Sequence, residues 1–462
     1  MAIRKLFIAN RGEIAVRIIR AAKSLGIETV QAHSEADAGM LAVQLADGAV
    51  CVGPAQAAKS YLNIAAVVAA AKDAGCDAVH PGYGFLAENA EFARAVEAAC
   101  MVFVGPTAET IDRMGDKVAA KIAAQAAGVP TVPGSDGRIE AAEAVAIAEG
   151  IGYPVMIKAA AGGGGRGIRI ATSAEELARL APQARAEAEA AFGDGGLYLE
   201  KVILNPRHIE VQILGDGTGA AVHCYERECS LQRRRQKVWE EAPAFGLPEA
   251  TRKALCDSAV ALAQAVNYRG AGTIEYLYDG AADRFYFIEM NTRIQVEHPV
   301  TEMVTGLDLV ALMLRIAGGE PLPLTQEQIS CTGHAIEVRL NAEDPFLQFL
   351  PFPGKVTALT IPVGEGVRFD HFLYEGYQIP PFYDSLLGKL IVRAEDRAAA
   401  IGRMADTLTG IEIGGLKTTI PLHLALAADA GVRAGEFHTQ WLEPWLAAGN
   451  LTAPHRSIGE RP

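Results

Sequence analysis

Two glutamates lie in a stretch whose pattern predicts a β-hairpin able to bind a metal ion. The sequence GTIEYLYDGAADRFYFIEM predicts two strands around a turn at 280–284. If Tyr278 lies opposite Tyr286, Glu275 lies directly opposite Glu289. Facing carboxylates repel and destabilise a sheet. A cation between them removes the repulsion, and oxygen ligands suit Mg²⁺ or Mn²⁺. The alternative is a solvated acidic pair on an exposed sheet face.

Polar residues alternate in the segment that follows these glutamates. If the strand continues, Asn291, Arg293, Gln295 and Glu297 share one face, because alternate residues of an extended chain point the same way. Arginine binds planar oxyanions in a fork, and a nearby carboxylate can act as a general base. The pattern therefore predicts a site for a small planar acid beside a metal–phosphate centre. A surface salt-bridge ladder is the alternative.

A glycine run predicts a loop that closes over phosphate groups. Lys158 and Arg166 flank four consecutive glycines, namely Gly162, Gly163, Gly164 and Gly165. Main-chain amides of such a turn can point at phosphates with no side chains in the way. The alternative is a hairpin with a loose tip, because glycine-rich matches alone are weak.

A local basic cluster at 232–241 stands out in an acidic chain. A solvated basic face is the usual explanation of such a run. With a polyphosphate already implied, Lys237 becomes a candidate contact. His80 and His208 are further candidates, although a lone histidine is more often structural.

The elements that must position these residues form an α/β and α+β pattern. Strands and helices alternate over the first hundred residues, which predicts a parallel layer, but NRGEIA is not a dinucleotide fingerprint. A linker near 129–137 precedes a helix at 139–149 and a small unit whose hairpin tip is the glycine run. Mostly strands with one helix follow over 208–297. A third region of strands and a helix extends from 333 to about 445.

Composition excludes several classes of protein. The chain has 462 residues and a net charge of -13, which argues against a nucleic-acid surface. Its seven cysteines contain no C-x-x-C pair, so we expect a reducing compartment. Charges interrupt the N-terminal apolar residues, and no uncharged run approaches the roughly 20 residues of a membrane helix. We therefore expect a cytoplasmic protein without membrane association.

The motifs together resemble biotin carboxylase of the ATP-grasp superfamily, almost end to end. The motifs that carry this resemblance are IANRGEIAVRI, HPGYGFLAEN, MGDK, the glycine run, EKVILNPRHIEVQ, GAGTIEY, EMNTRIQVEHPVTE, EVRLNAEDP and PPFYDSLLGKL. Of these, EMNTRIQVEHPVTE is highly specific and the glycine run alone is not.

The resemblance implies a three-part fold with a mobile lid. It places a preATP-grasp, Rossmann-like domain at 1–113 and an ATP-grasp domain at 114–332. The glycine-rich lid is a subdomain at about 131–203, whose tip folds over ATP. A biotin carboxylase C-terminal domain at 333–446 and a tail at 447–462 complete the chain.

The resemblance also implies a role for individual residues. The expected ATP-binding residues are Lys117, Lys158, Gly163, Gly164, Gly165, Glu200, Lys201, Ile203, His208, Gln232 and Leu277, with Lys237 at ATP and in catalysis. The expected metal ligands are Glu275, Glu289 and Asn291. The expected bicarbonate site comprises Arg293, Gln295, Val296 and the base Glu297, and biotin lies beside Tyr83 and Arg339.

The implied reaction uses ATP, Mg²⁺ or Mn²⁺, bicarbonate and biotin. Glu297 deprotonates bicarbonate, which attacks ATP to give carboxyphosphate. Carbon dioxide and phosphate follow, phosphate removes the biotin ureido proton, and Arg339 stabilises the enolate. The expected partners are a biotin carboxyl carrier protein and carboxyltransferase subunits, as in acetyl-CoA carboxylase of fatty acid biosynthesis, and a second copy in a homodimer.

Other functions stay open at this point. Another ATP-grasp carboxylate ligase and a non-catalytic nucleotide-binding subunit are the alternatives. The final acceptor can be acetyl-CoA, another acyl-CoA, pyruvate or urea. None of the nine methionines precedes a lysine, as biotin-attachment sites require, so we expect biotin on a separate carrier.

Three residues depart from the family pattern. Ala161 replaces a first lid glycine, Arg235 replaces a usual histidine, and Trp239 replaces a small aliphatic residue. The first bears on lid flexibility, and we expect the other two to lie near the nucleotide and to alter ATP affinity.

Overall fold

A five-stranded parallel sheet forms the N-terminal layer, as the alternation predicted. The computed structural model describes residues 3–135, 137–159, 169–192 and 195–452. The sheet has the order β3-β2-β1-β4-β5. Its strands are β1 (Lys5–Ile8), β2 (Glu28–Ser34), β3 (Gly48–Gly53), β4 (Ala78–His80) and β5 (Val102–Phe103), and its helices are α1 (Gly12–Ser24), α2 (Leu41–Leu45), α3 (Ile64–Asp73), α4 (Ala90–Ala98) and α5 (Ala108–Gly115). The next helix, α6 (Lys117–Ala126), packs instead against β13 (Arg284–Asn291) and α9 (Glu249–Ala265). The helix α1 is almost wholly buried because it also packs against α11 (Leu309–Ala317) and β18 (Val367–His371).

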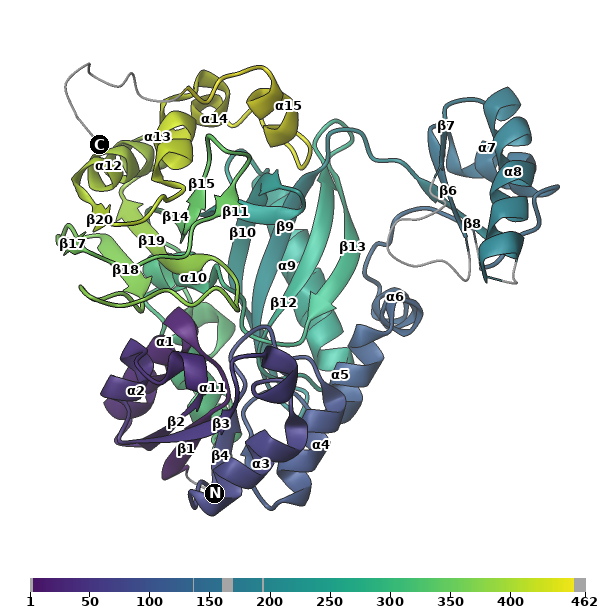
Figure 1. The fold of residues 1–462 in the computed structure, drawn as a ribbon. Helices are drawn as coiled ribbons and strands as arrows, with labels where there is room; N and C mark the ends of the chain where they lie inside the picture. The colour runs from purple at the N-terminus through teal and green to yellow at the C-terminus, as the bar shows by residue number, and fades with distance from the viewer. Residues whose placement is uncertain (1–2, 136, 160–168, 193–194, 453–462) are drawn as a thin grey trace.

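A small lobe stands apart from the body of the molecule (Figure 1). Its sheet has the order β7-β6-β8, built from β6 (Val155–Ala159), β7 (Arg169–Ala171) and β8 (Leu197–Lys201). The helices α7 (Ala144–Ile151) and α8 (Ala174–Phe192) cover it. The helix predicted at 139–149 therefore begins later, because Ile139 is held in a bridge to Leu197.

One eight-stranded sheet of order β13-β12-β9-β10-β11-β14-β19-β18 runs through the body. Its strands are β9 (Arg207–Asp216), β10 (Ala221–Arg233), β11 (Gln236–Ala242), β12 (Arg269–Asp279), β13 (Arg284–Asn291), β14 (His334–Asn341), β18 (Val367–His371) and β19 (Leu386–Ala394). The strands β14, β19 and β18 come from the C-terminal region, so this region extends the same sheet rather than forming a separate one. The domain boundary at 333 stays a prediction.

The remaining elements cover this sheet. They are α9 (Glu249–Ala265), α10 (His298–Thr305), α11 (Leu309–Ala317), α12 (Arg397–Gly410), α13 (Ile420–Ala428), α14 (Ala430–Ala434), α15 (Leu442–Ala447) and the short strands β15 (Glu343–Asp344), β16 (Leu350–Pro351), β17 (Ala358–Thr360) and β20 (Glu412–Gly414). Within the described ranges, no helix combines the length and the apolar character that crossing a membrane requires.

Candidate active site

A row of charged residues crosses four neighbouring strands of the eight-stranded sheet. Strand register places Arg227 of β10 opposite Glu210 of β9, Glu210 opposite Glu275 of β12, and Glu275 opposite Glu289 of β13. Like charges directly opposite one another destabilise a sheet. Three carboxylates and one guanidinium leave this row with excess negative charge, so further cations are needed beside it.

Lys237 supplies one such cation from the neighbouring strand β11. Its Nζ lies 2.5 Å from Glu210 Oε2, 3.0 Å from Glu275 Oε1 and 2.6 Å from Glu297 Oε1. Burial alone would lower the pKa of Lys237, but the three carboxylates raise it well above its usual value. The amine is therefore a fixed positive charge among three buried acids.

A β-bulge decides which side chains of β11 face the site. Lys237 pairs with Gln232, but Trp239 pairs with Leu231, so Val238 is an extra residue that shifts the alternation. As a result, Lys237 and Glu240 lie on the site face although they are three residues apart. Trp239 turns to the opposite face and is buried in the apolar core. The prediction that Trp239 lies near the nucleotide is therefore wrong.

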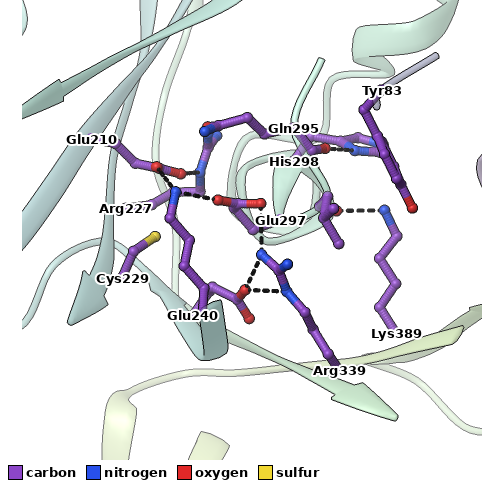
Figure 2. A network of polar contacts seen from close by, with 12 residues as sticks. Tyr83, Glu210, Arg227, Cys229, Glu240, Gln295, Glu297, His298, Arg339 and Lys389 are labelled. Carbon is purple, nitrogen blue, oxygen red and sulfur yellow. Dashed lines mark hydrogen bonds and ion pairs between the residues drawn. The ribbon is translucent and has the colours of Figure 1, made fainter. Parts of the chain in front are cut away.

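Arg339 of β14 bridges Glu240 and Glu297 (Figure 2). Its Nε donates to Glu240 Oε1 at 2.7 Å, and an Nη2–H donates to Glu297 Oε2 at 3.1 Å. Burial opposes the ionisation of Glu297, but Lys237 and Arg339 lower its pKa. Burial raises the pKa of Glu240 to about 7. Glu297 is thus held as a carboxylate between two cations.

Arg227 organises the floor of the site. It is fully buried, and all its donors are used: Nε to Glu210, and the two terminal nitrogens to Gln212, Thr301, Thr273 and Gln295. The bond to Gln295 Oε1 is 2.9 Å, and Gln295 Nε2 donates to Glu275 Oε1 at 2.7 Å. The Gln295 side chain therefore links Arg227 to Glu275.

His208 lies beside two carboxylates of the charged row, Glu210 and Glu275. Its Nε2 lies 3.1 Å from Glu275 Oε2, and its Nδ1 lies 3.3 Å from Gln232 Nε2. Burial would lower the pKa of His208, but Glu275 and Glu210 raise it to about 9. His208, Glu210 and Glu275 bring ligand atoms within 4.8 Å of one another. Because Lys237 already lies between the two carboxylates, this trio requires no metal ion.

The backbone after β13 differs from the predicted continuous strand. β13 ends at Asn291, and Glu297 is the residue that precedes α10, with φ -80° and ψ 7°. The prediction of one extended face is therefore wrong. Tertiary contacts nevertheless gather part of the set, because Asn291 Nδ2 donates to Glu275 Oε1 at 2.9 Å. Arg293 points instead to Glu88 at 2.9 Å and to Asn291 Oδ1 at 2.9 Å.

The donor set around Glu275 and Glu289 fits a hard divalent cation. The structure confirms that they are directly opposed, but the assumed pair of Tyr278 with Tyr286 is wrong. Tyr286 lies opposite Leu277, and a bulge at Ile288 restores the register at Glu289. Burial and the nearby Glu275 raise the pKa of Glu289. Two facing carboxylates, one of them with a raised pKa, provide the oxygen ligands that Mg²⁺ prefers.

A cavity of about 630 Å³ opens in front of Arg339. Tyr83, Val296, Lys237 and Glu13 line it, together with residues of the C-terminal region. The Tyr83 hydroxyl donates to Glu13 Oε1. Lys389 donates from Nζ to the Val296 carbonyl at 2.5 Å and lies 3.2 Å from Glu13 Oε1. Lys237 and Arg339, the two cations that contact Glu297, therefore both line this cavity.

The predicted nucleotide residues divide between the lobe and the sheet. On the lobe, Lys158 pairs with Glu200, and Lys201 Nζ donates to the carbonyls of Gly152 and Tyr153 at 2.9 and 2.6 Å. Ile203 follows the end of β8. On the sheet, His208 and Leu277 are cross-strand partners, and Gln232 contacts His208.

The described contacts do not join these two groups. Lys117 is exposed at the start of α6. It lies near enough to Glu289 to lower the pKa of that carboxyl group, which opposes the rise caused by burial and by Glu275. The glycine positions Gly163, Gly164 and Gly165, and with them the predicted lid tip and Ala161, lie outside the described residues.

Sequence reasoning missed several residues that complete the site. Glu210, Arg227, Glu240 and Lys389 are all buried and contact predicted site residues. A signal was present in RHIEVQIL, where polar residues alternate with apolar ones, although both faces of the strand are buried. A polar side chain on a buried strand needs a partner, which marks it as part of a site.

Comparison with known proteins matches three family models to successive parts of the chain. The family "Biotin carboxylase, N-terminal domain" matches residues 2–111. "Carbamoyl-phosphate synthase L chain, ATP binding domain" matches residues 116–325, and "Biotin carboxylase C-terminal domain" matches residues 337–444. The biotin carboxylase of Pseudomonas aeruginosa is 55% identical over 444 residues, which cover 96% of this chain and 98% of that protein.

Solved structures agree in fold. The biotin carboxylase domain of a thermophilic 2-oxoglutarate carboxylase bound to ADP is 48% identical and has a TM-score of 0.92, covering 98% of this chain and all of that one. The corresponding domain dimer of Hydrogenobacter thermophilus, in complex with MgADP, ADP and bicarbonate, is 47% identical. It has a TM-score of 0.86, with coverage of 98% and 100%.

The fold and the charged sheet face define an ATP-grasp enzyme with an N-terminal α/β layer and a C-terminal extension of the central sheet. This confirms the predicted fold class. More narrowly, the chain belongs to the biotin carboxylase family, whose members are ATP-dependent ligases.

Proposed function

We propose that this chain carboxylates biotin held on a separate carrier protein, using ATP and bicarbonate, with carboxyphosphate as the intermediate. The observation that carries the proposal is the state of Glu297. Its two oxygens contact Lys237 at 2.6 Å and Arg339 at 3.1 Å, and the cavity opens beside them. A carboxylate kept ionised next to two cations can take a proton from an anion that the same cations attract.

Bicarbonate is expected where the chain enters α10. The Gln295 side chain is already committed to Arg227 and Glu275. Among the described residues, no hydrogen bond occupies the main-chain N–H groups of Gln295 and Val296. Adjacent main-chain N–H groups without partners can together bind an anion. These two groups, with Lys237 and a reoriented Arg293, form the proposed bicarbonate site.

The chemical steps follow from this placement. Glu297 accepts the bicarbonate proton, and a bicarbonate oxygen attacks the γ-phosphorus of ATP. The bond between that phosphorus and the β–γ bridging oxygen breaks, giving ADP and carboxyphosphate. Carboxyphosphate separates into carbon dioxide and phosphate. Phosphate takes the ureido N–H proton of biotin, Arg339 stabilises the resulting enolate oxygen, and the nitrogen attacks carbon dioxide.

Nucleotide and metal have separate proposed sites. The ATP-binding residues are expected to be Lys117, Lys158, Gly163, Gly164, Gly165, Glu200, Lys201, Ile203, His208, Gln232 and Leu277. Glu275, Glu289 and Asn291 would hold Mg²⁺ or Mn²⁺, which when bound neutralises charge on the ATP phosphates. In the described structure Lys158 contacts Glu200 on the lobe, and His208 contacts Glu275 on the sheet. Closure of the lobe onto the sheet would bring Lys158 toward His208.

The carrier and carboxyltransferase subunits are the proposed partners. Tyr83 and Arg339 are the proposed biotin contacts within the cavity. Membership of the family supports the proposal that the chain works as a subunit of an acyl-CoA carboxylase such as acetyl-CoA carboxylase. The dimer of the Hydrogenobacter thermophilus domain supports the proposal that this chain forms a homodimer.

The test is bicarbonate-dependent turnover of ATP with biotin as acceptor. Glu297→Gln should lower this rate at least about a hundredfold, the usual contribution of a general base, and leave ATP affinity nearly intact. Glu249→Gln is the matched control, because Glu249 is largely exposed, and it should keep the wild-type rate. A Glu297→Gln rate near that of the wild type would overturn the assignment.

A further inference from the structure

Exposed apolar side chains flank residues that line the cavity. They lie on two segments, 346–352 and the loop at Phe382, and we call them the collar: Phe346, Leu347, Leu350, Phe352 and Phe382. Their sequence neighbours Phe349, Pro351 and Tyr383 line the cavity itself. The collar is therefore the outer continuation of the cavity wall.

The concentration of apolar side chains here is unusual for a free surface. Among the described residues, three of the four exposed phenylalanines belong to the collar, and Leu347 is 59% exposed. Single exposed apolar residues are ordinary, but a contiguous patch marks an interaction site. Aromatic side chains are also the ones enriched at binding hot spots. The collar thus has the composition of an interface.

The collar is held in place by contacts underneath it. The Arg233 guanidinium lies 3.9 Å from the Phe349 ring centre, and Arg233 donates to Glu343 Oε2 at 3.2 Å. Gln348 and Phe349 have φ of 54° and 60°, which is costly for side chains other than glycine. Because this strained loop is fixed against Arg233, the apolar side chains are preorganised for a partner.

The second segment is anchored on the N-terminal layer. Tyr383 contacts Ser34 Oγ through its hydroxyl at 2.6 Å and donates to the Ala55 carbonyl at 2.6 Å. Its ring packs on Arg11, whose Nε donates to Asp37 at 2.7 Å. Phe382 therefore projects outward from a rigid base.

We propose that the collar is the docking surface for the folded carrier domain that presents biotin. This inference rests on the proposed function. A biotin fixed to a protein can reach Arg339 through the cavity only if that protein lies across the cavity mouth, and the collar lies along this mouth. Arg234 and Arg235, exposed beside Arg233 at the tip of the β10–β11 hairpin, favour a partner face that is apolar with acidic residues at its edge.

The experiment compares carrier-bound and free biotin as acceptors. The biotinylated carrier domain of the same organism and free biotin are each titrated with wild type, Phe346→Ser and Leu347→Ser. Each variant should lower kcat/KM for the carrier about tenfold, as loss of an interface anchor does, and leave kcat/KM for free biotin unchanged. Val363→Ser is the matched control, since Val363 is 93% exposed outside the collar and cavity lining, and it should change neither value.

The outcomes separate this proposal from the function on which it rests. Suppose that the wild type carboxylates both acceptors. If the collar variants then lower kcat/KM equally for the carrier and for free biotin, or lower kcat/KM for neither acceptor, the collar proposal is wrong. If wild type carboxylates neither acceptor, the proposed function itself fails, and the collar proposal with it. If the collar variants instead abolish self-association without affecting carrier kinetics, the collar is a contact between copies of this chain and the proposal is overturned.

Discussion

Replacing Lys237 with methionine should destabilise the protein by removing a charge while keeping the length of the side chain. In the wild type, the Lys237 amine lies within 3.0 Å of three carboxylates. Each carboxylate retains one other cation after the change: Arg227 at Glu210, His208 at Glu275 and Arg339 at Glu297. Breaking a buried ion pair costs about 3–5 kcal/mol. Because each carboxylate keeps one cationic partner, we expect a loss of about 3 kcal/mol in the free energy of unfolding, at the lower end of this range.

This loss should depend on pH in a defined direction. The pKa of Glu275 is lowered well below 4.5, so its contribution is present above its unfolded value and is lost as pH falls through the folded value. The pKa of Lys237 is raised well above 10.5, so its contribution is lost only as pH rises through that higher value. The difference between wild type and variant should therefore be constant from about pH 5 to about pH 7, where Glu240 begins to titrate, and shrink below about pH 4.5.

Thermal unfolding of both proteins at a series of pH values measures the effect. At about 2.1 cal/mol/K of unfolding entropy per residue, a loss of about 3 kcal/mol lowers the melting temperature of a chain of this size by about 3 °C. Lys253→Met is the control, because Lys253 forms an exposed pair with Asp257 and should shift stability by less than about 0.5 kcal/mol. A Lys237→Met shift no larger than the control, or a difference that grows toward acid pH, would refute the reasoning.

Three further changes test other parts of the site. Glu240→Gln should lower kcat several-fold, because Glu240 orients Arg339. With the pKa of Glu240 near 7, the variant should also lose a rise in rate between pH 6 and 8, and an unchanged pH–rate profile would argue against this role. Glu289→Gln should raise the free energy of unfolding, measured with a chelator present, by up to about 1 kcal/mol, because the repulsion from Glu275 is relieved. The variant should also be stabilised less by MgATP; calorimetry with and without Mg²⁺ measures both effects, and equal stabilisation by MgATP would contradict the metal assignment. Trp239→Val should cost about 3 kcal/mol in denaturant unfolding but leave the KM for ATP unchanged, whereas a raised KM would return Trp239 to the nucleotide site.

Local patterning was sufficient to predict most elements. The predicted alternation over the first hundred residues is the parallel layer of β1 to β5, and the two strands predicted around the turn at 280–284 are β12 and β13. The opposition of Glu275 and Glu289 was also predictable, because a short hairpin limits the possible registers. The bulge at Ile288 was not, since the mostly apolar run FYFIEM does not show where an extra residue shifts the alternation.

Residues that act from distant strands were beyond this kind of reasoning. Arg227 and Lys389 each donate hydrogen bonds to residues that are distant in sequence. Arg227 and Gln295 are 68 residues apart, and Lys389 and Val296 are 93 residues apart. Only the pairing order of the eight-stranded sheet brings them together, and strand order depends on non-local contacts. The backbone turn after Asn291 was missed for the same reason, because α10 packs against β14 and β19.

The sequence by itself determined which chemical groups are available and which family fold carries them. It contained the glutamates, the amide and guanidinium after them, and the motifs of the family, and these depend only on residue type and spacing. The tertiary structure decided which cationic side chain neutralises which carboxylate. A bulge at Val238 put Lys237 and Glu240 on one face. Strand register placed Glu210 beside Glu275, and the turn into α10 added Glu297 as the third carboxylate around Lys237. Electrostatic energy depends on distance and burial, and only the folded chain fixes these two quantities.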